Sequence, residues 1–222
     1  MSSYQTIESI NYMYNKPLFI TGIGTEVGKT IVSAVLTEQL QADYWKPVQA
    51  GDLDNTDTFK VKQLISNSRS IFHPETFKFN MPASPHRAAK HEGIEIRQQD
   101  FVLPETSNQL LIEGAGGLFV PLSYRFLMID LIRLLGAEAV LVTRNYLGCI
   151  NHTLLSIHAL QSKGIPLKHL VLNGDFDFDT LNMLLHHLPR NCTWSKLPEF
   201  TTINKDAIAN APFQLSPTPI TT

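Results

Sequence analysis

The chain has 222 residues, of which 43% are hydrophobic and 17% charged, and its formal net charge is −2 at pH 7. This length and composition are typical of one soluble α/β domain with a sizeable core. The small net charge gives no electrostatic basis for binding nucleic acid or an anionic membrane. No apolar run approaches the roughly 20 residues of a membrane-spanning helix, and no secretory signal pattern is visible. The two cysteines show no metal-site spacing, and we expect a protein of the reducing cytoplasm.

Three parts are expected along the chain. Residues 1–16 are polar and weakly patterned, which indicates an N-terminal arm, and the proline- and threonine-containing stretch 211–222 indicates a loosely packed C-terminal tail. Between them, residues 17–210 form a single α/β domain in which strand-like runs alternate with helical patterns. The predicted strands are 18–21, 44–47, 109–112, 139–143 and 170–173, and the predicted helices are 29–41, 56–66, 126–135, 149–163 and 179–187. This alternation predicts a mostly parallel sheet with helices on both faces.

The first predicted strand leads into a glycine-rich turn and then into Gly28-Lys29-Thr30 at the start of a helix. Glycines let backbone N–H groups wrap a polyanion, and the first turn of a helix stabilises phosphate. Lys29 can reach phosphate oxygens, and the hydroxyl of Thr30 can bind Mg²⁺. The usual pattern begins with glycine, whereas Ile23 occupies that position here, between two glycines. The context of strand and helix therefore predicts a variant phosphate-binding loop.

Charged residues follow two other predicted strands. The carboxyl ends of parallel strands meet at one edge of a sheet, where ligands bind. Asp57 and Glu113 would lie there beside Thr30, and oxygen ligands of this kind suit Mg²⁺. Lys46 would place a second cation near the phosphates and offset charge as a phosphoryl group moves. The alternatives are a helix-starting acid for Asp57, a structural salt bridge for Glu113 and a solvated surface lysine for Lys46.

Five strings link the chain to a known family. They occur in order at predicted strand ends and loops: TGIGTEVGKT (21–30), KPVQ (46–49), SPH (84–86), EGAGG (113–117) and LGCINH (147–152). Together they closely resemble the dethiobiotin synthetases, the ATP-dependent carboxylases of biotin synthesis, over about residues 17–200. The resemblance implies a P-loop NTPase-like fold, a homodimer with active sites near its interface, and 7,8-diaminopelargonate, CO₂ and Mg-ATP as reactants.

The resemblance also implies a reaction. One amine of the diamine is carbamylated by CO₂, the carbamate attacks the γ-phosphate of ATP, and the second amine closes the ureido ring and expels phosphate. Catalytic roles are implied for Thr25, Lys29 and Lys46, and Mg²⁺ would be held by Thr30, Asp57 and Glu113. The implied nucleotide contacts are Glu26, Val27, Gly28, Lys29, Thr30, Asn173, Pro198 and Glu199.

The implied substrate contacts come from two subunits. Thr25 and Lys46 match positions near the carbamate, and Ala50 lies beside the substrate amines. The helix start of the other subunit would receive the substrate carboxylate through Gly148, Cys149, Ile150 and Asn151. A helix N-terminus attracts carboxylate for general electrostatic reasons, which agrees with this role.

Three features depart from the family pattern. Ala50 stands where the family usually has a serine or threonine hydroxyl, which affects the expected substrate affinity more than the reaction. The arm before the first strand is longer than usual, and the stretch after about residue 205 has no counterpart.

Two other functions compete with the synthetase. One is an ATP-dependent amidoligase with a different carboxylate or amine substrate, because a fold does not determine a function. The other is a nucleotide-switch ATPase of the partition or site-selection kind. Such switches carry an additional lysine early in the loop, and residues 21–28 contain none. No basic amphipathic membrane-seeking segment is visible either.

Overall fold

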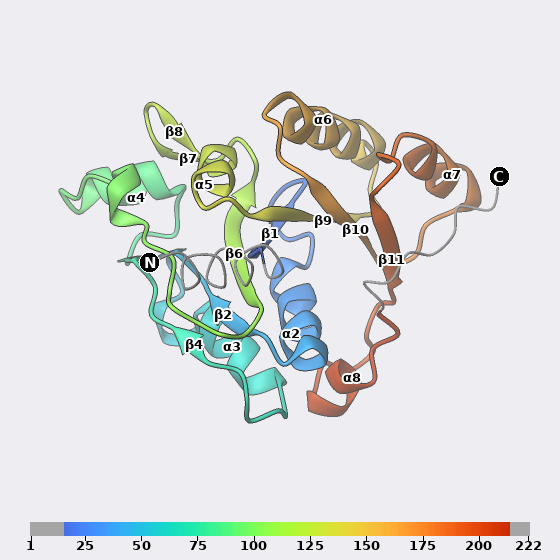
Figure 1. The fold of residues 1–222 in the computed structure, drawn as a ribbon, viewed down its shortest axis with the longest axis horizontal. Coiled ribbons are helices and arrows are strands. Elements are labelled where there is room, and N and C mark those ends of the chain that lie inside the picture. Colours follow the sequence, from blue (N-terminus) through green and yellow to red (C-terminus); the bar gives the residue numbers. More distant parts are fainter. Residues whose placement is uncertain (1–15, 214–222) are drawn as a thin grey trace, which may run out of the picture.

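The computed structural model describes residues 16–213, which form an α/β domain around a seven-stranded parallel sheet (Figure 1). Its strands run, in spatial order, β11 (Thr193–Leu197), β10 (Leu167–Asn173), β9 (Glu138–Arg144), β1 (Leu18–Gly22), β6 (Leu110–Gly117), β2 (Asp43–Trp45) and β4 (Phe72–His73). The predicted parallel sheet is therefore confirmed. The N-terminal arm lies outside the described residues, except for residue 16.

Helices cover both faces of the sheet (Figure 1). One face carries α2 (Lys29–Leu40), α3 (Asp57–Leu64) and α8 (Lys205–Ala209), and the other carries α5 (Met128–Leu134), α6 (Cys149–Ser162) and α7 (Phe178–His186). The remaining elements are α4 (Pro85–His91), two 3₁₀ turns (Leu53–Asn55 and Gln98–Asp100), a parallel pair of β3 (Val48–Ala50) with β5 (Phe77–Phe79), and an antiparallel pair of β7 (Pro121–Ser123) with β8 (Phe126–Leu127). None of the helices within residues 16–213 combines the length and apolarity needed to cross a membrane.

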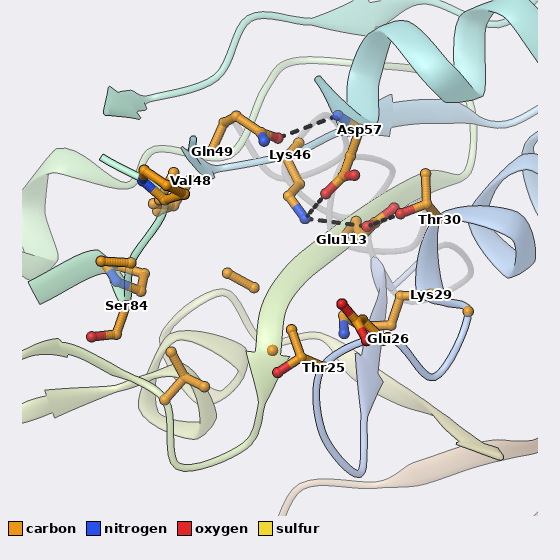
Figure 2. Close-up of a pocket in the computed structure, with 18 of the residues that line it drawn as sticks. Thr25, Glu26, Lys29, Thr30, Lys46, Val48, Gln49, Asp57, Ser84 and Glu113 are labelled. Atoms are coloured by element: carbon orange, nitrogen blue, oxygen red, sulfur yellow. Dashed lines mark hydrogen bonds and ion pairs between the residues drawn. The ribbon is translucent and has the colours of Figure 1, made fainter. Parts of the chain in front are cut away.

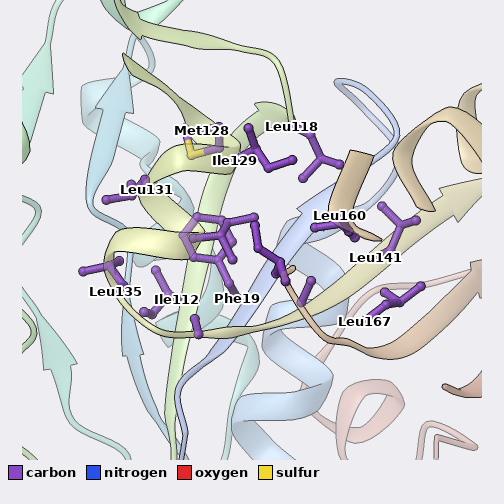
Figure 3. Close-up of a cluster of buried hydrophobic side chains, with 14 of the residues drawn as sticks. Phe19, Ile112, Leu118, Met128, Ile129, Leu131, Leu135, Leu141, Leu160 and Leu167 are labelled. Carbon is purple, nitrogen blue, oxygen red and sulfur yellow. The ribbon is translucent and has the colours of Figure 1, made fainter. Parts of the chain in front are cut away.

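The alternation of strand side chains divides the core into two layers. Phe19 and Ile112 belong to the layer beneath α5 and α6, whereas Ile20 and Leu111 belong to the layer beneath α2. Figure 3 shows Phe19 at the centre of the first layer, next to side chains from α5 and β6. Strands buried on both faces explain why their sequences are apolar at nearly every position. This double packing fixes β1 and β6, whose carboxyl ends carry the candidate site.

Several predicted boundaries differ from the structure. The helix predicted from 126 begins at Met128, because residues 126–127 pair with β7 instead. The stretch 67–107, where no strand or helix was predicted, contains α4, two short strands and a 3₁₀ turn. Neither β11 nor α8 was expected, since both contain few consecutive apolar residues. At the start of the predicted C-terminal tail, Ala211 and Phe213 are buried against the α2 layer, and residues 214–222 of that tail lie outside the described residues.

A buried histidine connects β10 and β11. The two ring nitrogens of His169 form hydrogen bonds with the hydroxyls of Thr193 and Ser195, and the ring of Phe213 lies 5.2 Å from that of His169, centre to centre. Burial lowers the pKa of His169 from 6.5 to about 4. The imidazole is therefore neutral in the folded protein at neutral pH.

We expect this histidine to make stability depend on pH. Between pH 6.5 and about 4 the unfolded chain binds a proton at residue 169 that the folded chain does not. The free energy of unfolding therefore falls as the pH is lowered through this window, by about 3 kcal/mol. Urea unfolding at several pH values, compared between the parent protein and His169→Gln, measures this contribution. Equal pH dependence in the two proteins would contradict it.

Candidate active site

The loop between β1 and α2 has the conformation expected of a phosphate site. Gly28 precedes the helix with φ at 94°, and a Cβ at this position would lie 2.1 Å from Nδ2 of Asn173. Only glycine meets both conditions. The amide of Asn173 in turn donates to the carbonyl of Val27 at 2.8 Å, which fixes the loop to the end of β10. The loop is thus held between the end of β1, the N-terminus of α2 and the end of β10, which lies beyond β9 in the sheet.

Lys29 folds back over this loop. Its ammonium donates to the carbonyl oxygen of Gly24 at 2.9 Å, and the side chain is mostly buried. Burial lowers the pKa of Lys29 to about 8, and the nearby charge of Glu113 only partly offsets that effect. A polyanion bound in the loop would stabilise the protonated ammonium.

Lys46 lies between two carboxylates beside the loop (Figure 2). Its Nζ is 2.6 Å from Oδ2 of Asp57 and 3.1 Å from Oε1 of Glu113. Burial alone would lower the pKa of Lys46, but the two carboxylates together outweigh it and raise the pKa. Burial alone would raise the pKa of Asp57, but the charge of Lys46 outweighs burial and lowers this pKa. Lys46 and Asp57 are therefore both charged at neutral pH.

Glu113 is the most enclosed charge of the site. Its side chain is inaccessible to solvent, and it accepts hydrogen bonds from Thr30, Ser33, Tyr44 and Lys46. Burial, and after it the charge of Glu113, raises the pKa of Tyr44 well above its usual range. The phenol therefore stays protonated and donates a hydrogen bond to Glu113. The salt bridge that was the alternative interpretation of Glu113 is present, with Lys46 as its partner. The alternative for Lys46, a solvated surface lysine, is wrong because this residue is only 3% exposed.

These groups line one cavity of about 640 Å³. Figure 2 shows loop residues on one side of it and residues that follow β2 and β5 on the other. Nine predicted site residues line it: Thr25, Glu26, Gly28, Lys29, Thr30, Lys46, Ala50, Asp57 and Glu113. Sequence reasoning did not assign Gln49 and Ser84, which also line the cavity, or Ser33 and Tyr44, which lie behind Glu113. The spacing of Ser33 three residues after Thr30 on a helix was the available signal.

The other predicted residues lie away from this cavity. Val27 is buried under the loop and Asn173 contacts it, while Pro198 lines a second cavity together with Gly174 and Trp194. Glu199 forms an ion pair with Arg144 at 2.8 Å. Gly148, Cys149, Ile150 and Asn151 form the start of α6, which does not line the cavity of its own chain.

The oxygen groups fit a hard divalent cation. Thr30 Oγ1 lies 3.0 Å from Glu113 Oε1, and Asp57 and Glu113 already share the ammonium of Lys46. Within residues 16–213 there is no cluster of three or more His, Cys, Asp or Glu side chains suited to a metal. A site with two carboxylates and one hydroxyl leaves positions for phosphate oxygens and water, which is the usual pattern for Mg²⁺ beside a nucleotide.

Comparisons with known proteins agree with this geometry. The AAA domain family matches residues 16–205. A crystal structure of a ParA family ATPase from Chlorobium tepidum is similar with a TM-score of 0.51 and 12% identity over 87% of both chains, which shows a shared fold alone.

Curated relatives carry more specific names. ATP-dependent dethiobiotin synthetases of three organisms are similar to this chain. The identity is 54% for Christiangramia forsetii (covering 72% of this chain and 77% of the relative), 47% for Cytophaga hutchinsonii (covering 78% and 84%) and 44% for Brucella ovis (covering 78% and 81%). Identity at this level, over most of both chains, shows that the chain belongs to the dethiobiotin synthetase family.

Proposed function

We propose that this protein is a dethiobiotin synthetase, which uses ATP, Mg²⁺ and CO₂ to convert 7,8-diaminopelargonate into dethiobiotin. The family membership of the chain carries the reaction class. The observation that supports the chemistry is that Lys46, Glu113 and the phosphate loop line the same cavity. A cavity with a phosphate site and adjacent charges suits transfer of a phosphoryl group to a second small molecule.

ATP would bind through the loop. The backbone N–H groups of residues 26–28 and the ammonium of Lys29 would hold its phosphates, in line with the helix N-terminus behind them. Asn173 would lie beside the base together with Pro198 and Glu199. Two contacts support this: Asn173 bonds to the loop, and a Cβ at Gly174 would come within 3.4 Å of Glu199 Cγ. These contacts bring the end of β10 and the segment after β11 close to the loop.

Mg²⁺ would be held by Thr30, Asp57 and Glu113. When bound, it would neutralise phosphate charge as a Lewis acid. The enclosure of Glu113 supports this assignment, because its four hydrogen-bond donors hold the carboxylate in one orientation.

The proposed reaction has three steps. One amine attacks CO₂ and loses a proton, which forms a carbamate. A carbamate oxygen then attacks the γ-phosphorus, the bond to the bridging oxygen of ADP breaks, and a carbamic–phosphoric anhydride results. The second amine attacks the carbonyl carbon and loses a proton, the C–O bond to phosphate breaks so that phosphate leaves, and the ureido ring closes. Lys46 and Lys29 would offset negative charge in the second step, and Thr25 would position the carbamate.

The substrate carboxylate would be held by a second copy of the chain. The start of α6, residues 148–151, does not line the cavity of its own chain, yet its backbone N–H groups suit a carboxylate. Beside it, Leu147 is fully exposed, and Leu155 is 58% exposed. Exposed apolar side chains of this kind favour coverage by a partner, which supports a homodimer.

A product assay tests the proposal. Phosphate release with Mg-ATP and bicarbonate is expected to depend on 7,8-diaminopelargonate and to match dethiobiotin, identified by mass, one to one. Phosphate release that does not require the diamine, without product, would refute the proposal in favour of another amine substrate or a nucleotide switch.

Replacement of Lys29 by alanine is expected to abolish turnover. The variant loses the buried charge that faces the phosphates, and kcat should fall by about 1000-fold. Lys163→Ala is the control, because Lys163 pairs with Asp130 at a surface position outside the cavity. Steady-state phosphate release compares the three proteins. A Lys29→Ala variant with near-normal kcat would refute the assignment of the loop.

Restoring a hydroxyl at position 50 is expected to improve binding of the diamine. Ala50 lines the cavity beside Gln49, and a serine there could accept or donate a hydrogen bond worth about 1 kcal/mol, or roughly a fivefold lower KM. Ala83→Ser places a hydroxyl elsewhere on the cavity wall and serves as the control. If Ala50→Ser leaves the KM for the diamine unchanged, another group already performs this role.

A further inference from the structure

The two oxygens of the Glu113 carboxylate have different surroundings. Oε1 contacts Thr30 Oγ1 at 3.0 Å and Lys46 Nζ at 3.1 Å, and both residues line the cavity. Oε2 accepts hydrogen bonds from Ser33 Oγ at 2.6 Å and from the hydroxyl of Tyr44 at 2.9 Å, and neither of these residues lines the cavity. One oxygen therefore faces the reactants, and the other is bound from behind by two hydroxyls.

We propose that Tyr44 and Ser33 are positioning residues, which hold Oε2 of Glu113 so that Oε1 is presented to Mg²⁺. This inference rests on the proposed function, in which Glu113 is a metal ligand. Partners that bind the far side of a metal ligand orient it and tune its basicity. The hydroxyls are neutral and leave the negative charge of Glu113 available to the ion, whereas the ammonium of Lys46 competes for that charge.

Burial and packing hold both hydroxyls beside Glu113. Tyr44 pairs with Leu111 across β2 and β6, so its side chain lies on the same face as Leu111 and as Glu113, two residues further on. The Tyr44 ring is fully buried and packs 5.7 Å from the ring of Phe72, centre to centre. Ser33 is also fully buried, and it follows Thr30 by one turn of α2, on the same helix face.

A purely structural role would have a different consequence. Buried polar groups are normally hydrogen-bonded, so the two hydroxyls also contribute to stability. If that were their whole role, their removal would lower the free energy of unfolding without changing the affinity for a metal ion. The affinity for a metal ion therefore distinguishes a positioning role of the two hydroxyls from a purely structural role.

The test is a titration with Mn²⁺, followed by electron paramagnetic resonance, of the full chain saturated with ADP. Tyr44→Phe keeps the ring, and Ser33→Ala is a second, smaller change. Each variant is expected to raise the Kd for Mn²⁺ by about tenfold, and excess Mg²⁺ should restore much of its rate of dethiobiotin formation. Metal-free ADP affinity is expected to be unchanged, since neither hydroxyl faces the loop.

Two further variants make the result specific. Thr37→Val removes another buried hydroxyl of α2, one turn beyond Ser33. The Oγ1 of Thr37 has no hydrogen-bond partner within residues 16–213, so this variant should leave the Kd for Mn²⁺ unchanged. Glu113→Gln should raise this Kd at least as much as Tyr44→Phe. Thermal unfolding confirms that each variant is folded at the assay temperature.

The outcomes separate the two proposals. If Glu113→Gln weakens Mn²⁺ binding but Tyr44→Phe and Ser33→Ala stay within about twofold of the parent, the positioning role is overturned and the metal ligand stands. If Glu113→Gln has no effect, both the ligand assignment and the positioning role fail. If the hydroxyl variants weaken Mn²⁺ binding although the parent makes no dethiobiotin, the positioning role stands and the proposed reaction fails.

Discussion

The burial of one carboxylate organises this molecule. Glu113 is shielded completely from solvent, and an unpaired charge in such a place would destabilise the fold by several kcal/mol. Its partners come from α2, from β2 and from the residue after β2, so the helix behind the phosphate loop and the neighbouring strand are tied to β6 at one point. The same contacts that satisfy the charge therefore set the positions of Thr30 and Lys46.

After the end of β2 the chain leaves the main sheet close to Glu113. Pro47 has no N–H to donate, so a ladder hydrogen bond is lost where the strand stops at Trp45. The chain then pairs with β5 as a separate short strand, and the carbonyl of Pro47 accepts from the N–H of Phe77 at 3.0 Å. This departure from the main sheet leaves Lys46 turned toward Glu113 and places Ala50 on the cavity wall.

Sequence alone predicted the parts of the site that follow from local rules. The phosphate loop and Glu113 stand directly after strand-like runs, Asp57 follows another such run further along the chain, and parallel strands bring such positions to one edge. Tyr44 was missed because, within an apolar run, a tyrosine is indistinguishable from a core residue until its hydroxyl has a partner. The strand β11 was missed because it has few apolar residues, and the hydrogen bonds that Thr193 and Ser195 form with His169 cannot be read from its own sequence. Burial of Phe213 depends on a long-range contact that no local pattern records.

The fold and the function of this chain rest on different residues. The likeness to a ParA family ATPase at 12% identity concerns the fold alone, and a fold does not determine a function. The features that suit a second reactant lie on the cavity wall outside the loop, where Lys46 joins two carboxylates and where Gln49 and Ser84 line the same space. A switch needs a surface that changes with the nucleotide, whereas a wall of fixed, buried charges suits the transfer of a phosphoryl group. The buried, hydrogen-bonded surroundings of Glu113 are therefore an argument for a synthetase.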